Sequence, residues 1–90
     1  MQWNPEVQQR FKAMIAKIPI FHRGITENAV TLRAEENAAS RKSAQVEEQD
    51  VIGAFFSDVP NPFYSMMIRL LDQSGLDYKK YGFPKNGKSK

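Results

Sequence analysis

Cysteine is absent from this 90-residue sequence, and histidine occurs only once, as His22. Without thiols the chain alone cannot form a disulfide, a thiolate zinc site or an iron–sulfur cluster. One imidazole also argues against a zinc site built from histidines. We therefore expect no metal site and no cofactor held by this chain alone, and a reducing, cytoplasmic compartment.

Long apolar runs are also missing. No stretch approaches the roughly 20 apolar residues that a membrane-spanning helix needs. The N-terminus lacks the basic region and apolar stretch of a signal peptide. The five glycines are scattered rather than gathered in a phosphate-binding loop, and no set of nucleophile, base and acid is evident. The sequence thus predicts no membrane association and no catalytic residue of its own.

Negative charge is missing from the C-terminus, since no acidic residue follows Asp77. Thirteen basic and ten acidic residues give a net charge of +3, but five lysines lie between positions 79 and 90. Residues 1–78 then carry eight basic and ten acidic side chains, a net charge of −2. A nucleic-acid-binding domain should instead concentrate positive charge on a structured face. We expect a disordered basic tail over residues 85–90 and no specific nucleic-acid binding.

The clearest local signal is a helix start at Asn4-Pro5. Asparagine is a good N-cap residue, and proline is tolerated at the first helical position because its missing N–H has no partner there. Pro19 ends this helix. The inward face is predicted to comprise Val7, Phe11, Met14, Ile15 and Ile18. We expect Trp3, just before the helix, to fill part of the core.

Three further helices are expected. The second spans about 21–40, with an apolar stripe formed by Phe21, Ile25, Ala29 and Leu32. The third begins near residue 47, where acidic residues crowd the first turn, and turns inward Val51, Ala54 and Phe55. The fourth follows Asn61-Pro62, ends at Gly75 and has an apolar face of Phe63, Met66, Met67, Leu70 and Leu71. The predicted fold is a small all-α domain of about four helices over residues 1–84.

Several positions in the first half of the chain carry a family resemblance. They are Trp3, Pro5, Glu6, Arg10-Phe11, Ile18-Pro19, Phe21 and Arg23-Gly24. This pattern resembles the C-terminal domain of the light-independent protochlorophyllide reductase B subunit, over about residues 3–52. The resemblance implies a PCP reductase-like accessory domain that assists a tetrapyrrole or partner-protein site. It implies nitrogenase-like reductase subunits as partners, with the catalytic groups outside this chain.

The corner between the first two expected helices holds the candidate contact residues, His22 and Arg23. A cation near a helix N-terminus can meet an anionic group such as a propionate. Arg10 is a further candidate, because it matches the resembling motif as Arg23 does. We therefore predict an apolar groove with a cation at its rim. The alternative is an ordinary surface turn in which Arg23 pairs with an acid or covers Phe21.

A second resemblance gives an alternative architecture. Residues 39–43, followed by 46–51 and Ala54, are similar to the end of the long helix and the last helix of a histone fold. That reading implies a dimerisation module with weak DNA binding. The net acidic charge of residues 1–78 opposes it, because neutralisation of phosphates drives such binding.

Overall fold

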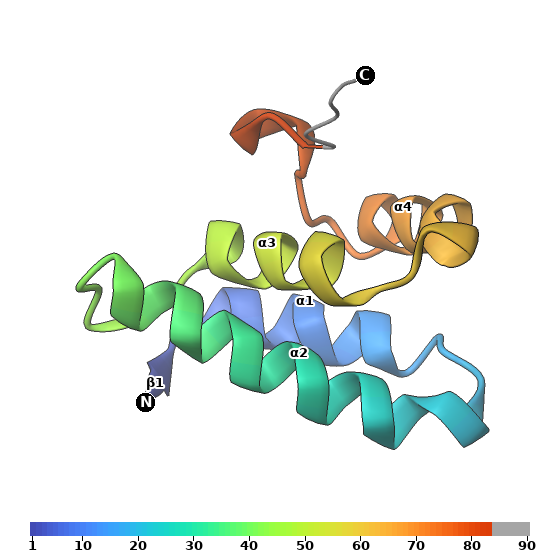
Figure 1. Cartoon of the computed structure of the whole chain (residues 1–90), viewed down its shortest axis with the longest axis horizontal. Coiled ribbons are helices and arrows are strands. Elements are labelled where there is room, and N and C mark those ends of the chain that lie inside the picture. Colours follow the sequence, from blue (N-terminus) through green and yellow to red (C-terminus); the bar gives the residue numbers. More distant parts are fainter. Residues whose placement is uncertain (84–90) are drawn as a thin grey trace.

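The protein is described by a computed structural model that places residues 1–83. Within that range it is an all-α domain with four α-helices, as predicted, and measures 33 × 32 × 20 Å. Helices α1, α2 and α3 lie roughly side by side, and α4 extends from one end of α3 (Figure 1). In chain order the elements are β1 Gln2–Trp3, α1 Pro5–Ile15, α2 Ile20–Ser40, β2 Gln45–Val46, α3 Glu48–Asp58, the 3₁₀ turn η1 Asn61–Phe63, α4 Tyr64–Gln73 and the 3₁₀ turn η2 Lys79–Tyr81.

Helix α1 begins as the sequence predicts. The Asn4 side-chain oxygen accepts from the backbone N–H groups of Glu6 (3.0 Å) and Val7 (3.3 Å), which satisfies donors that have no partner inside the helix. The predicted inward face is confirmed, with buried side chains at Val7, Phe11, Met14, Ile15 and Ile18. The capped start and this apolar face fix α1 in the core.

A two-residue parallel strand pair joins the N-terminus to the segment after α2. Gln2 lies opposite Gln45 and Trp3 opposite Val46. Val46 is fully buried and ties the loop after α2 to the core. The Trp3 ring is only partly buried; it stacks on Phe11 with ring centroids 5.2 Å apart. The strands were not predicted, because two residues are too few to show an alternating pattern.

The buried face of α2 differs from the predicted stripe. Large side chains that should have faced the core lie in solvent, with exposed fractions of 88% at Phe21, 75% at Ile25 and 65% at Leu32. The core-facing residues are instead Val30, Ala34 and Ala38. Small side chains let α3 pack closely against α2, which bulky residues would prevent. The prediction of the stripe as an inward face was therefore wrong, although the helix itself is correct.

An ion pair at the start of α3 holds the far end of α2. Asp50 is 2% exposed, and its carboxylate accepts from the Arg41 guanidinium at 2.9 and 2.6 Å. The same carboxylate accepts from the backbone N–H of Glu47 at 2.9 Å, which completes a capping box at the helix start. This contact raises the pKa of Arg41, chiefly through the hydrogen bond to Asp50. Asp50 was expected only to interact with the helix dipole. It is instead buried and joins the start of α3 to the end of α2.

Helix α4 starts later than predicted and is less completely buried. Asn61-Pro62 opens the 3₁₀ turn η1, and the α-helix begins at Tyr64. Three predicted core residues are buried, namely Met67, Leu70 and Leu71. The other two are substantially exposed, by 53% at Phe63 and 36% at Met66. Two apolar side chains at the start of this segment therefore face outward.

The end of α4 follows its predicted signal. Gly75 has φ +77°, the left-handed conformation that favours glycine, and the Leu76 N–H donates to the Leu71 carbonyl. Beyond it, Phe83 stacks on Phe56 with ring centroids 4.9 Å apart, so the chain returns to α3. The predicted tail of residues 85–90 and the predicted domain end at residue 84 lie outside the described residues.

Candidate functional site

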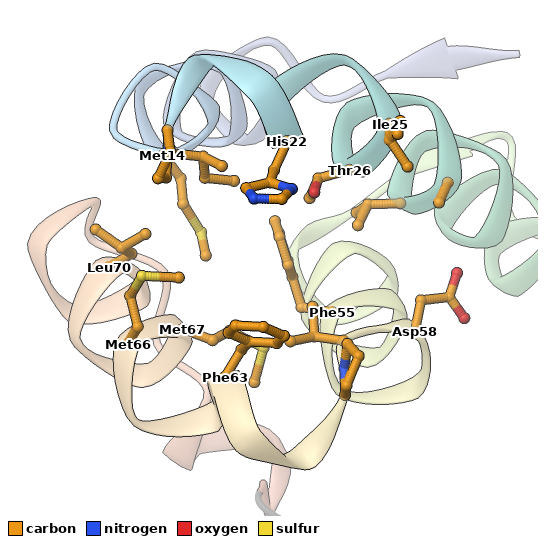
Figure 2. Close-up of a pocket in the computed structure, with 16 residues that line it drawn as sticks. Met14, His22, Ile25, Thr26, Phe55, Asp58, Phe63, Met66, Met67 and Leu70 are labelled. Carbon is orange, nitrogen blue, oxygen red and sulfur yellow. The ribbon is translucent and has the colours of Figure 1, made fainter.

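A groove opens between the first half of α2 and the segment that runs from the end of α3 into α4. Its volume is about 460 Å³. Figure 2 shows His22, Ile25 and Thr26 on one wall and Phe63, Met66 and Met67 on the other. Most of the lining is apolar; the residues are Met14, Ile18, Pro19, His22, Ile25, Thr26, Ala29, Val30, Phe55, Asp58, Val59, Pro60, Phe63, Met66, Met67 and Leu70.

Two proline-marked breaks shape the groove. Pro19 separates α1 from α2, so α2 turns away from the α1 axis and its first two turns are left uncovered. Pro60 follows the end of α3 at Asp58 and directs the chain across to Phe63. Both walls thus diverge from a common buried floor that includes Met14.

Few polar groups reach this groove. Asp58 lies at one end, where its carboxylate accepts from Arg33 Nε at 3.2 Å. His22 and Thr26 lie on α2, and the His22 ring projects into the opening (Figure 2). Such a site can bind an apolar molecule and orient it with one or two hydrogen bonds. Three methionines, Met14, Met66 and Met67, let the lining adapt to the shape of an occupant.

The structure separates the three predicted contact residues. His22 lines the groove, but Arg23 does not. The Arg23 guanidinium donates to the backbone carbonyls of Ile18 (2.9 and 3.1 Å) and Ala16 (3.0 Å), so it closes the carboxyl end of α1. Arg23 therefore belongs to an ordinary surface turn, the alternative to a ligand contact. Its partners in that turn are backbone carbonyls and not an acid.

Arg10 also lies away from the groove. Its guanidinium pairs with Glu6 at 2.8 Å and donates to the Gly75 carbonyl at 2.9 Å. It also lies 4.0 Å from Glu48 and so joins α1 to the end of α4 and the start of α3. An apolar groove is present, but it lacks the predicted cation at its rim, because neither Arg10 nor Arg23 lines it.

Sequence reasoning missed the opposite wall. Phe63 and Met66 were assigned to the core because they share the spacing of buried residues. The Pro60-Asn61-Pro62 segment marks only where α3 ends and a new element begins, and it does not show which side of that element is covered. Periodicity alone does not distinguish a core face from a groove wall.

No catalytic centre is evident among residues 1–83. They contain no group of three or more histidine, aspartate or glutamate residues placed to hold a metal ion. One strongly shifted group lies outside the groove: burial raises the pKa of Tyr81 to about 12, and its 2.7 Å hydrogen bond to Glu48 adds to the effect. A phenol that stays protonated so firmly is suited to a structural role. Within the same residues no helix has the length and apolar character that crossing a membrane requires.

No protein-family model, curated protein or solved structure that was compared with this chain gives a match. The resemblance to the PCP reductase-like domain and the histone-like alternative both stay predictions. The groove between α2 and α4 is therefore the feature on which a function can be argued.

Proposed function

We propose that this chain is a non-catalytic binding domain whose groove accepts a flat, largely apolar ligand at a site shared with a partner protein. One observation carries the proposal: an open groove of about 460 Å³ with almost entirely apolar walls and exposed apolar side chains at its mouth. This volume falls within the roughly 300–1,000 Å³ typical of small-molecule sites. The resemblance to the PCP reductase-like domain supports a tetrapyrrole as the ligand and nitrogenase-like reductase subunits as partners.

The walls suit a planar ring system. Phe63 presents an aromatic side chain across the opening from His22 (Figure 2), and a flat ligand can stack on either ring. The His22 imidazole can also hydrogen-bond a carboxylate or carbonyl at the ligand edge. We therefore propose His22, and not Arg10 or Arg23, as the polar contact.

A partner is needed because the groove is too open to enclose such a ligand. Small-molecule sites commonly bury 70–90% of the ligand surface. Here Ile25 is 75% exposed and Phe63 is 53% exposed, so both would stay in contact with water beside a bound ring. A partner surface laid over these residues would complete the site. We further propose a cytoplasmic location, which is supported by the absence of cysteine.

Titration with protochlorophyllide or a soluble porphyrin, followed by backbone amide shifts, tests this function. We expect shifts over residues 22–30 and 58–70, with weak affinity for the isolated chain because the partner surface is missing. Phe63→Ala should weaken binding about tenfold or more, since it removes a stacking face. Ile20→Ala is the matched control, because Ile20 is 70% exposed but does not line the groove.

Two results would contradict the proposal. The first is an absence of shifts at a large excess of either ligand. The second is a set of shifts that leaves the groove unaffected, such as one centred on Arg10 and the end of α4. Equal binding by Phe63→Ala and the unsubstituted chain would place the ligand elsewhere.

A further inference from the structure

His22 places an unused nitrogen donor on the wall of the groove. The residue is exposed, and its ring projects into the opening (Figure 2). Within residues 1–83 only its backbone N–H has a partner, the Pro19 carbonyl at 2.9 Å, so both ring nitrogens are available to an occupant. A neutral imidazole has a lone pair on one nitrogen, and histidine is the commonest protein ligand of metal ions.

The rest of the lining offers little help to a bare metal ion. Asp58 carries the one carboxylate among the described lining residues, and it lies at the end of the groove, paired with Arg33 at 3.2 Å. No group of three histidine, aspartate or glutamate residues suited to a metal ion exists within residues 1–83. A metal ion can therefore bind beside His22 only if most of its coordination positions are already filled.

A tetrapyrrole fills those positions, because its ring nitrogens hold the metal and leave only the axial positions to the protein. We propose that the ligand of this groove is a haem-type iron tetrapyrrole and that His22 is its axial ligand. The imidazole lone pair replaces a water molecule on the iron, so His22 contacts the centre of the ring and not its edge. This inference rests on the function proposed above and specifies the class of tetrapyrrole.

The donor atoms of the groove favour iron over magnesium. Imidazole nitrogen suits iron, whereas magnesium prefers carboxylate, carbonyl and water oxygens. Histidine and methionine together are the axial ligands in one class of haem protein. Met66 is 36% exposed and lies with Phe63 on the wall opposite His22 (Figure 2), so the second face of the ring meets a thioether and a phenyl group.

The neighbouring Arg23 fixes the helix start that presents His22. Its guanidinium donates to the carbonyls of Ile18 and Ala16 and so holds the turn between α1 and α2. His22 therefore stands on the first turn of a long helix whose start is anchored, and a ligand on such an element is held more precisely than one on a loop.

Haemin and metal-free protoporphyrin IX separate the contribution of the iron from that of the ring, because they share the macrocycle and its acidic side chains. We expect the full chain to bind haemin at least about tenfold more tightly, since loss of a group that merely orients a metal ligand already costs about 10–100-fold in metal affinity. The absorption band of bound haemin should shift as it does on axial ligation by imidazole. In His22→Phe, which keeps a flat ring at this position, haemin should lose its advantage over the metal-free ring.

The double variant His22→Phe/Ile20→His is the matched control. It returns one histidine to the start of α2, at a position that is 70% exposed and does not line the groove. We expect no recovery of the haemin advantage; full recovery would show that any surface histidine suffices and would overturn the proposal. Circular dichroism confirms the folding of both variants, which is expected because His22 and Ile20 are exposed.

The outcomes distinguish this inference from the function on which it rests. Equal affinity for haemin and protoporphyrin IX would overturn the iron ligand but leave the proposed function standing if Phe63→Ala still weakens both. Binding of neither compound would contradict the proposed function itself. A haemin advantage that survives in His22→Phe would overturn His22 as the axial ligand, and tighter binding of magnesium protoporphyrin IX than of haemin would overturn the choice of iron.

Discussion

Asp50→Ala should be among the most destabilising single substitutions in this protein. The carboxylate accepts two hydrogen bonds from Arg41 and one from the Glu47 backbone, and Asp50 is 2% exposed. Hydrogen bonds to a charged group contribute about 1.5–3 kcal/mol, and a helix N-terminal capping bond contributes about 1 kcal/mol. The Arg41 side chain is 37% exposed and can regain water, which reduces the loss. We therefore expect the free energy of unfolding to fall by about 3 kcal/mol.

Urea titration monitored by circular dichroism measures this loss. Asp72→Ala is the matched control, because Asp72 is an exposed aspartate near the end of α4. Its removal should change the free energy of unfolding by less than about 0.5 kcal/mol. The reasoning fails if Asp50→Ala costs less than about 1 kcal/mol, since the pair would then contribute no more than an exposed ion pair.

Two further predictions concern pH and the backbone. Because the pKa of Tyr81 rises from 10.0 to about 12 on folding, its contribution to stability is full below pH 10 and is lost as the pH rises toward 12. At pH 7 Tyr81→Phe should have a lower free energy of unfolding than the unsubstituted chain. The difference between the two free energies should narrow between pH 10 and 12. A difference that stays constant over this range would contradict the prediction. Gly24→Ala should stabilise the protein by about 0.5–1 kcal/mol, because alanine favours helix and the Cβ site is open. Urea titration measures this gain, and a destabilised variant would mean that the space is filled.

Local signals predicted most of the fold. The Asn4-Pro5 start and the Gly75 end each depend on a few adjacent residues, so the sequence displays them directly. The predicted end of the first helix at Pro19 was too late, because α1 ends at Ile15 and Pro19 instead precedes α2. The all-α class follows from these signals together. The strand pair of Trp3 and Val46 depends on two segments about forty residues apart, which no local pattern reveals.

The faces of α2 and the walls of the groove were harder to predict. Phe21, Ile25 and Leu32 have the spacing of a buried stripe, and only the packing of α3 on the alanine face shows that they are exposed. The role of Arg23 was equally hard to predict. In the sequence, an arginine at a helix junction has the same pattern whether it binds a ligand or donates to backbone carbonyls, as it does here. His22 is the one predicted contact residue that lines the groove, and its role as a contact stays a prediction.

The parallel strand pair has a consequence for the order of folding. It joins residues 2–3 to residues 45–46, so all of α1 and α2 lies inside the loop that it closes. Closing a loop of this length costs chain entropy that neighbouring helical turns do not incur, so local helical contacts should form first. We expect the strand pair to form last and to fix the N-terminus in place. Weakening it at Val46 should accelerate unfolding more than it slows folding, which stopped-flow kinetics in urea would resolve as a change in the unfolding limb.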